Sequence, residues 1–134
     1  MGKSLFVTAF LLASASVAVA DDDLPPLNVV CFGDSTTAPR GTLKVYSDLL
    51  NGQRTASGRV VQTTNSGIPG DHTNRARQRF EKDVTAHQPD VVIIQFGIND
   101  AAVDVWRDPP ATEPRVSREA YRENLRFFIH QLQQ

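Results

Sequence analysis

The sequence has 134 residues, of which 40% are hydrophobic and 22% are charged, a composition typical of globular domains. Its formal net charge of −1 gives no electrostatic reason to expect nucleic acid or an anionic membrane as a partner. A single cysteine, Cys31, excludes an intrachain disulfide, and its place in an apolar run indicates a small buried side chain, not a reactive thiol.

Residues 1–20 have the features of a secretory signal peptide. Lys3 precedes an uncharged apolar run that finishes in an A-x-A cleavage site at Ala20. An uncleaved membrane anchor is the alternative, because the run is near the short end for a span of ~20 residues. We expect cleavage, which gives a secreted or periplasmic protein without a stable membrane span. The mature chain then has an acidic lead-in over residues 21–27 and a domain over residues 28–134.

Three apolar stretches alternate with helical patterns along this domain. The sequence predicts strands over residues 28–32, 59–64 and 90–96, and helices over residues 43–50, from 71 or 73 to 87, and after Ser117. The third strand is apolar on both faces, which is typical of a strand covered on both sides. Strands that alternate with helices predict an α/β fold with a parallel sheet.

Right-handed crossovers favour the strand order 2-1-3 in a flavodoxin-like three-layer α/β/α arrangement, here incomplete. In open α/β sheets ligands bind at the carboxyl ends of the strands. Three polar turns with glycine fall at this edge, over residues 33–35, 65–70 and 97–100. A long loop over residues 101–114 follows, and such loops are often functional. Trp106 in this loop either lines a substrate pocket or anchors the loop in the core.

Ser35 is the candidate nucleophile, because its hydroxyl lies where the first strand ends. Attack on an ester carbonyl places negative charge on oxygen, and preorganised donors must stabilise that charge. The candidate donors are the backbone N–H groups of Ser35 and Gly67 and the side-chain amide of Asn99. Asp34 is expected to organise its own turn, since a short carboxylate bonds nearby N–H groups. Asp100 is expected to support the third turn.

Two other functions use the same crevice. A non-catalytic binding module would hold an acyl, acetylated-sugar or phosphate-bearing ligand. A flavodoxin-like phosphate site would take an anion on the hydroxyls of residues 35–37. Asn99 discriminates between these, because an oxyanion hole uses such an amide and a phosphate loop has no particular need of it.

The three turns together resemble the motifs of the SGNH (GDSL) hydrolase family of serine esterases and lipases. Gly33-Asp34-Ser35 resembles the first block, Gly67 the oxyanion glycine of the second, and Gly97-Ile98-Asn99-Asp100 the third. The resemblance covers residues 29–132. It implies a secreted esterase or acetylesterase that forms an acyl-enzyme on small lipid, short-chain or carbohydrate esters. It implies no cofactor and no metal.

One family motif is missing from the sequence. The last block, Asp-x-x-His, supplies the general base and its orienting acid, and it does not occur in these 134 residues. Because a serine hydroxyl without a base is a weak nucleophile, we expect an N-terminal part of the domain with little activity alone. The third strand would then be an open edge that favours self-association. His72 is the candidate substitute base, whereas His87 and His130 are interpreted as structural.

Overall fold

The computed structural model describes residues 24–134, so the predicted signal peptide lies outside the described residues. No helix in this part of the chain is both long enough and apolar enough to cross a membrane. The elements in chain order are β1 (Leu27–Gly33), α1 (Tyr46–Leu50), β2 (Val61–Gly67), α2 (Thr73–Asp83), the 3-10 turn η1 (Thr85–His87), β3 (Val91–Gln95) and α3 (Arg118–Leu132).

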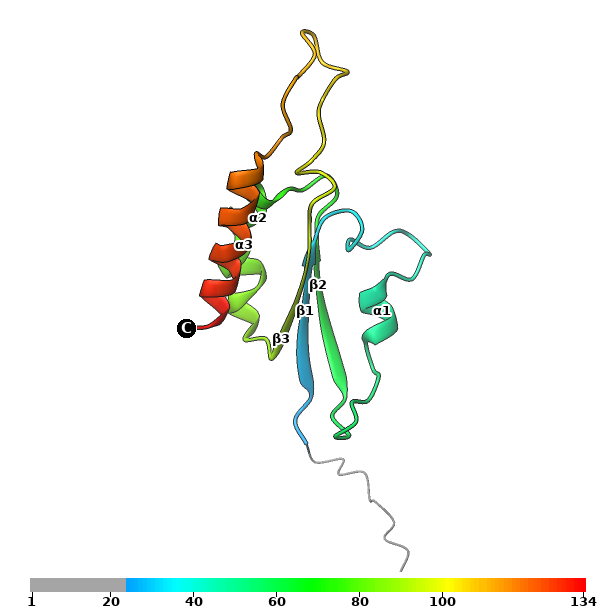
Figure 1. Ribbon diagram of the computed structural model, residues 1–134. Helices are drawn as coiled ribbons and strands as arrows, with labels where there is room; N and C mark the ends of the chain where they lie inside the picture. The colour runs from blue at the N-terminus through cyan, green and yellow to red at the C-terminus, as the bar shows by residue number, and fades with distance from the viewer. Residues whose placement is uncertain (1–23) are drawn as a thin grey trace, which may run out of the picture.

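The three strands form a parallel sheet in the order β2-β1-β3. Helices α2 and α3 cover one face and α1 lies on the other, which gives three layers (Figure 1). The predicted fold class and strand order are therefore confirmed. β2 continues to Gly67, because its last residues pair with the end of β1 up to Gly33. The predicted turn over residues 65–70 is thus half strand.

The third strand differs from its expected environment. Within residues 24–134, β3 pairs with β1 alone, and β1 is the central strand. Val92 and Ile94 pack against the core on one face and Ile93 against the cluster on the other, but these side chains are only half-buried and Val91 is 42% exposed, so the cover is incomplete in this part of the chain. Self-association through this edge stays a prediction.

The larger core lies between the sheet and helices α2 and α3. Phe32 packs edge-to-face against Phe80 and Phe128, with ring centroids 5.5 and 5.6 Å apart. Ala76, Phe80 and Val84, which recur every four residues, are buried there. On the opposite face, a smaller cluster packs against α1, and it consists of Val29, Cys31 and Val61.

The side chain of Arg79 in α2 joins the carboxyl ends of two strands. Its Nη2 donates to the carbonyl oxygen of Gly33 at 3.1 Å, and its Nη1 donates to that of Ser66 at 2.9 Å. The guanidinium also lies over the Phe32 ring, 4.4 Å from the centroid. One planar cation therefore holds the ends of β1 and β2 together and rests on the core.

The same guanidinium forms ion pairs with two carboxylates. Its Nε and Nη2 contact Oδ2 of Asp71 at 2.9 and 2.8 Å, and its Nη1 contacts Asp83 at 2.9 Å. The Arg79 side chain is 14% exposed and that of Asp71 only 1% exposed. Asp71 begins the approach to α2, so this ion pair fixes the chain that leaves β2.

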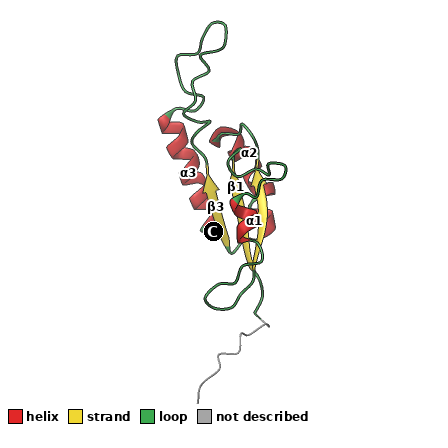
Figure 2. Cartoon of the chain, turned by 90° about the vertical axis from the view of Figure 1, so that its right-hand side faces the viewer, coloured by secondary structure: helices red, strands yellow, loops and turns green. Residues whose placement is uncertain are grey.

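A long loop over residues 101–116 rises from the carboxyl end of the sheet (Figures 1 and 2). Asp104 closes its base: the buried carboxylate accepts from Arg115 Nε at 2.9 Å and pairs with Arg107 at 2.8 Å. Hydrogen bonds from Arg115 hold the pKa of Asp104 below its usual range, and the charge of Arg107 and a hydrogen bond from Trp106 add to this. Trp106 is itself 75% exposed, so its interpretation as a core anchor is wrong.

The ion pair of Arg79 yields a stability prediction. Arg79→Met keeps an unbranched side chain but leaves the buried Asp71 carboxylate with only the more distant and exposed Arg75, 3.6 Å away. Breaking a buried pair in this way costs on the order of 3–5 kcal/mol in the free energy of unfolding, measured by urea denaturation. Arg126→Met is the matched control, because Arg126 is 69% exposed and 3.8 Å from Glu123. A similar loss of stability in both variants would contradict the burial argument.

The loop should respond to acid through Asp104. Its folded-state pKa is lowered, so the ion pairs stabilise the loop above the ordinary aspartate pKa of ~3.9, and this stabilisation is lost as the pH falls through the lower folded value. Trp106, the one tryptophan of the sequence, reports the change by fluorescence. We expect a constant spectrum above about pH 5 and a shift below about pH 4. Asp104→Asn should show the acid spectrum at neutral pH; a wild-type spectrum there would be evidence against this role.

Candidate functional site

Ser35 lies two residues beyond β1, in a turn that Asp34 organises. The Asp34 side chain is buried, and its Oδ1 accepts from the backbone N–H and the hydroxyl of Thr36, both at 2.8 Å. Its carbonyl oxygen accepts from Thr37 and Ala38 at 3.1 and 3.0 Å. The Ser35 hydroxyl makes no hydrogen bond to another residue of the described chain. The turn therefore presents a hydroxyl that is available to a ligand.

Two glycines allow this turn to pack against the strand ends. A Cβ at Gly33 would lie 2.1 Å from the Thr37 hydroxyl oxygen, and one at Gly67 would lie 2.3 Å from the Ala38 nitrogen. Real Cβ atoms do not approach so closely, and the second contact is with rigid backbone. Gly67 is thus required for the close approach of the Ser35 turn, whatever its chemical role.

The second turn offers two candidate N–H donors. The Gly67 N–H donates to Asn65 Oδ1 at 3.0 Å, so it already has an acceptor. Gly70 has a φ of +73°, and its N–H makes no hydrogen bond within residues 24–134. Gly67 stays the donor that the sequence predicts, and Gly70 is a second candidate that only the backbone reveals, because it shows which amide already has an acceptor.

The third turn is bonded to the second. Asn99 Nδ2 donates to the carbonyl oxygen of Asp71 at 2.9 Å, and Arg115 Nη1 lies 3.5 Å from Asn99 Oδ1. These partners orient the amide with its nitrogen toward the turn that contains Gly70. The structure therefore brings Asn99 and the second turn together.

Asp100 attaches the third turn to the start of α2. Its Oδ1 accepts from the Thr73 backbone N–H at 2.9 Å and from the Thr73 hydroxyl, and Asn124 in α3 donates to that hydroxyl at 3.0 Å. The Val116 N–H donates to the Asp100 carbonyl oxygen at 3.1 Å. Asp100 thus supports the turn from inside the protein, where it is 3% exposed.

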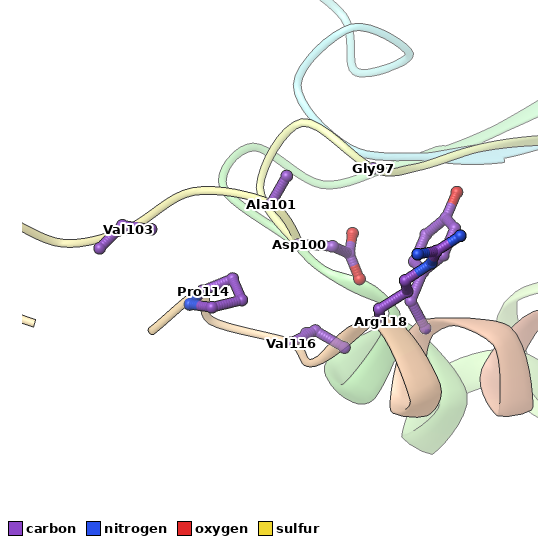
Figure 3. Close-up of a pocket in the computed structure, with 8 residues that line it drawn as sticks. Gly97, Asp100, Ala101, Val103, Pro114, Val116 and Arg118 are labelled. Carbon is purple, nitrogen blue, oxygen red and sulfur yellow. The ribbon is translucent and has the colours of Figure 1, made fainter. Parts of the chain in front are cut away.

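An apolar cavity of about 470 Å³ lies beside Asp100 (Figure 3). The Oδ2 atom of Asp100 is buried there without a hydrogen-bond partner in the described chain. Tyr121 donates to the Phe96 carbonyl oxygen at 3.1 Å, and burial followed by the Asp100 charge raises its pKa. The lining residues are Gly97, Asp100, Ala101, Val103, Pro114, Val116, Arg118 and Tyr121.

A second cavity, of about 400 Å³, has mainly polar walls. Its wall combines Gly70 and His72, at the approach to α2, with residues of the long loop. His72 Nδ1 is buried without a partner in the described residues, and no hydrogen bond links His72 to Ser35. The other lining residues are Arg75, Asp104, Arg107, Ala111, Glu113, Pro114 and Arg115. Within residues 24–134, no group of three or more His, Cys, Asp or Glu side chains is placed to hold a metal ion.

Three comparisons with known proteins agree with this geometry. The chain is 37% identical over 135 residues to the uncharacterised lipoprotein YqeF of Bacillus subtilis (strain 168), a match that covers 95% of this chain and 49% of that protein. It is 36% identical over 72 residues to an acetylxylan esterase of Geobacillus stearothermophilus, covering 52% of this chain and 31% of that one. The crystal structure of a lipase/acylhydrolase from Enterococcus faecalis has a TM-score of 0.62 and 35% identity, covering 78% and 51%.

The chain spans about half the length of the first and third of these relatives. A model of the GDSL-like lipase/acylhydrolase family matches residues 31–134, which include all three turns. This match and the likeness to solved members show that the chain belongs to the GDSL-like lipase/acylhydrolase family, the SGNH hydrolases.

Proposed function

We propose that the whole protein is a serine esterase that cleaves small carboxylic esters, with Ser35 as its nucleophile. The observation that carries this proposal is the unbonded Ser35 hydroxyl at the carboxyl end of the central strand, at the sheet edge where the strands before the second and third turns also end. Ser35 Oγ attacks the ester carbonyl carbon, its proton passes to a base, and the alcohol leaves with a proton. Water then hydrolyses the acyl-serine and releases the acid.

The oxyanion is stabilised by N–H donors from all three turns. Ser35 provides its backbone N–H and Asn99 its side-chain amide, which is oriented by the Asp71 carbonyl oxygen. We assign the donor of the second turn to Gly70, with Gly67 as the alternative. The bond from the Gly67 N–H to Asn65 Oδ1 supports this choice, because that donor would have to exchange partners.

No described residue is hydrogen-bonded to the Ser35 hydroxyl as a general base would be. We assign this role to a histidine of the Asp-x-x-His type in the whole protein, with His72 as the alternative. His72 is the second choice because its Nδ1 is buried and no hydrogen bond joins His72 to Ser35. Asp100 and Asp34 remain supporting residues, because their carboxylates are bonded to their own turns.

We also propose that the protein acts outside the cytoplasm, on an esterified lipid, short-chain or carbohydrate substrate. The signal-like residues 1–20 support export, as does the lipoprotein relative. The acetylxylan esterase relative supports a carbohydrate ester among these classes.

Ser35 should be the only residue labelled by an organophosphate ester in the full-length protein. Ser35→Ala removes the atom that forms the acyl-enzyme and should lower kcat on 4-nitrophenyl acetate on the order of 10⁶-fold. Mass spectrometry of the labelled protein locates the adduct, and Ser57→Ala, in an exposed turn, serves as the control. Substantial activity in Ser35→Ala, or an adduct elsewhere, would exclude this nucleophile.

Asn99 should act on the transition state more than on the bound ester. Asn99→Ala should lower kcat by ~10²–10³ with little change in KM, as for other oxyanion donors. Asn28→Ala is the control, since Asn28 is an exposed amide near the amino end of β1, away from the three turns. If Asn99→Ala raises KM and leaves kcat intact, Asn99 contacts the ground state instead.

A further inference from the structure

The long loop over residues 101–116 presents a tryptophan on a preorganised base. Trp106 is 75% exposed, while Asp104 two residues earlier is 3% exposed and bonded to Arg107 and Arg115. The Arg107 guanidinium lies 5.6 Å from the Trp106 ring centroid, so the ring is bordered by a fixed cation. An exposed indole offers a large apolar face at little cost in conformational entropy, because it has few rotatable bonds.

The polar cavity shares a wall residue with the contact of this ring. Arg107 belongs both to the cavity wall and to the Trp106 contact, and Gly70 also lines the cavity. Arg115, another lining residue, lies 3.5 Å from the Asn99 amide oxygen. The cavity wall therefore holds one arginine that contacts the exposed ring and another that contacts the Asn99 amide.

The cavity wall mixes hydrogen-bond donors and acceptors. The Arg75 side chain is 59% exposed, and its ion pair with Asp71 is long, at 3.6 Å. Much of its guanidinium is therefore available to donate hydrogen bonds to a ligand. Glu113 provides a carboxylate acceptor, and arginine provides up to five N–H donors. A long acyl chain in this space would remove water from these polar groups and offer no hydrogen bonds in its place. Sugar hydroxyls both donate and accept, and thus match the wall.

We propose that Trp106 and the polar cavity bind the carbohydrate portion of the ester substrate, with a sugar ring packed on the indole and its hydroxyls on the cavity wall. This inference rests on the proposed esterase function, of which it specifies the substrate class.

A membrane surface is the competing partner for an exposed tryptophan. Val105 beside it is 66% exposed, which would suit insertion into lipid. The loop contains three acidic residues and two arginines, so it offers no attraction to anionic headgroups. The polar cavity next to it, lined by arginine and carboxylate side chains, favours the carbohydrate instead.

The test compares two acetyl esters in the full-length protein, a partially acetylated cello-oligosaccharide and 4-nitrophenyl acetate. Trp106→Ala should lower kcat/KM for the oligosaccharide about 3- to 10-fold more than for the nitrophenyl ester, as loss of one aromatic contact predicts. The change should lie in KM, and Trp106→Phe should restore most of it. Val105→Ala should leave the ratio of the two substrates at the wild-type value.

Binding is measured separately by isothermal titration calorimetry with the unacetylated oligosaccharide, which needs neither catalysis nor the tryptophan as a reporter. Saturable binding heat that is lost in Trp106→Ala and kept in Val105→Ala supports the proposal. An equal loss of kcat/KM on both esters would overturn it, as would Trp106-dependent binding to phosphatidylcholine vesicles without any effect of the oligosaccharide. If the wild-type protein hydrolyses neither ester, the proposed function fails, while the titration still decides whether this surface binds carbohydrate.

Discussion

The ion pair between Arg79 and Asp71 is the interaction on which the arrangement of the site depends. Burying two charges costs several kcal/mol per ion, and their attraction alone rarely offsets that cost. Here the guanidinium has further acceptors, the carbonyl oxygens at the ends of β1 and β2 and the Asp83 carboxylate. The pair therefore contributes more to the positions of the strand ends and of Asp71 than to stability, because a planar guanidinium donates hydrogen bonds in fixed directions.

Asp71 extends this order to the third turn. Its carboxylate binds Arg79, and its carbonyl oxygen accepts from the Asn99 amide. One residue thus couples the turns after β1 and β2 to the turn after β3, although these are separate segments of the chain. The glycines at 33 and 67 complete the arrangement by allowing the Ser35 turn to approach the strand ends.

The fold and the rough location of the site could be predicted because both depend on local patterns. β-branched runs predicted the strands, and turn residues after each run predicted which side chains meet at one edge. Arg79 could not be predicted, since an arginine in a helical pattern usually faces solvent, and only packing shows that it is 14% exposed. The difference between Gly67 and Gly70 depends on which amide the Asn65 side chain engages, and the exposure of Trp106 depends on the course of a loop.

The burial of Cys31 in the central strand has a consequence for the handling of this protein. The thiol is fully buried, and desolvation raises its pKa, opposed in part by a hydrogen bond with Tyr46. A thiol in this state is neither ionised nor accessible, so folded copies do not crosslink under oxidising conditions. A reagent can reach the sulfur only when β1 separates from its neighbours. The rate of Cys31 alkylation therefore measures how often the middle of the sheet opens.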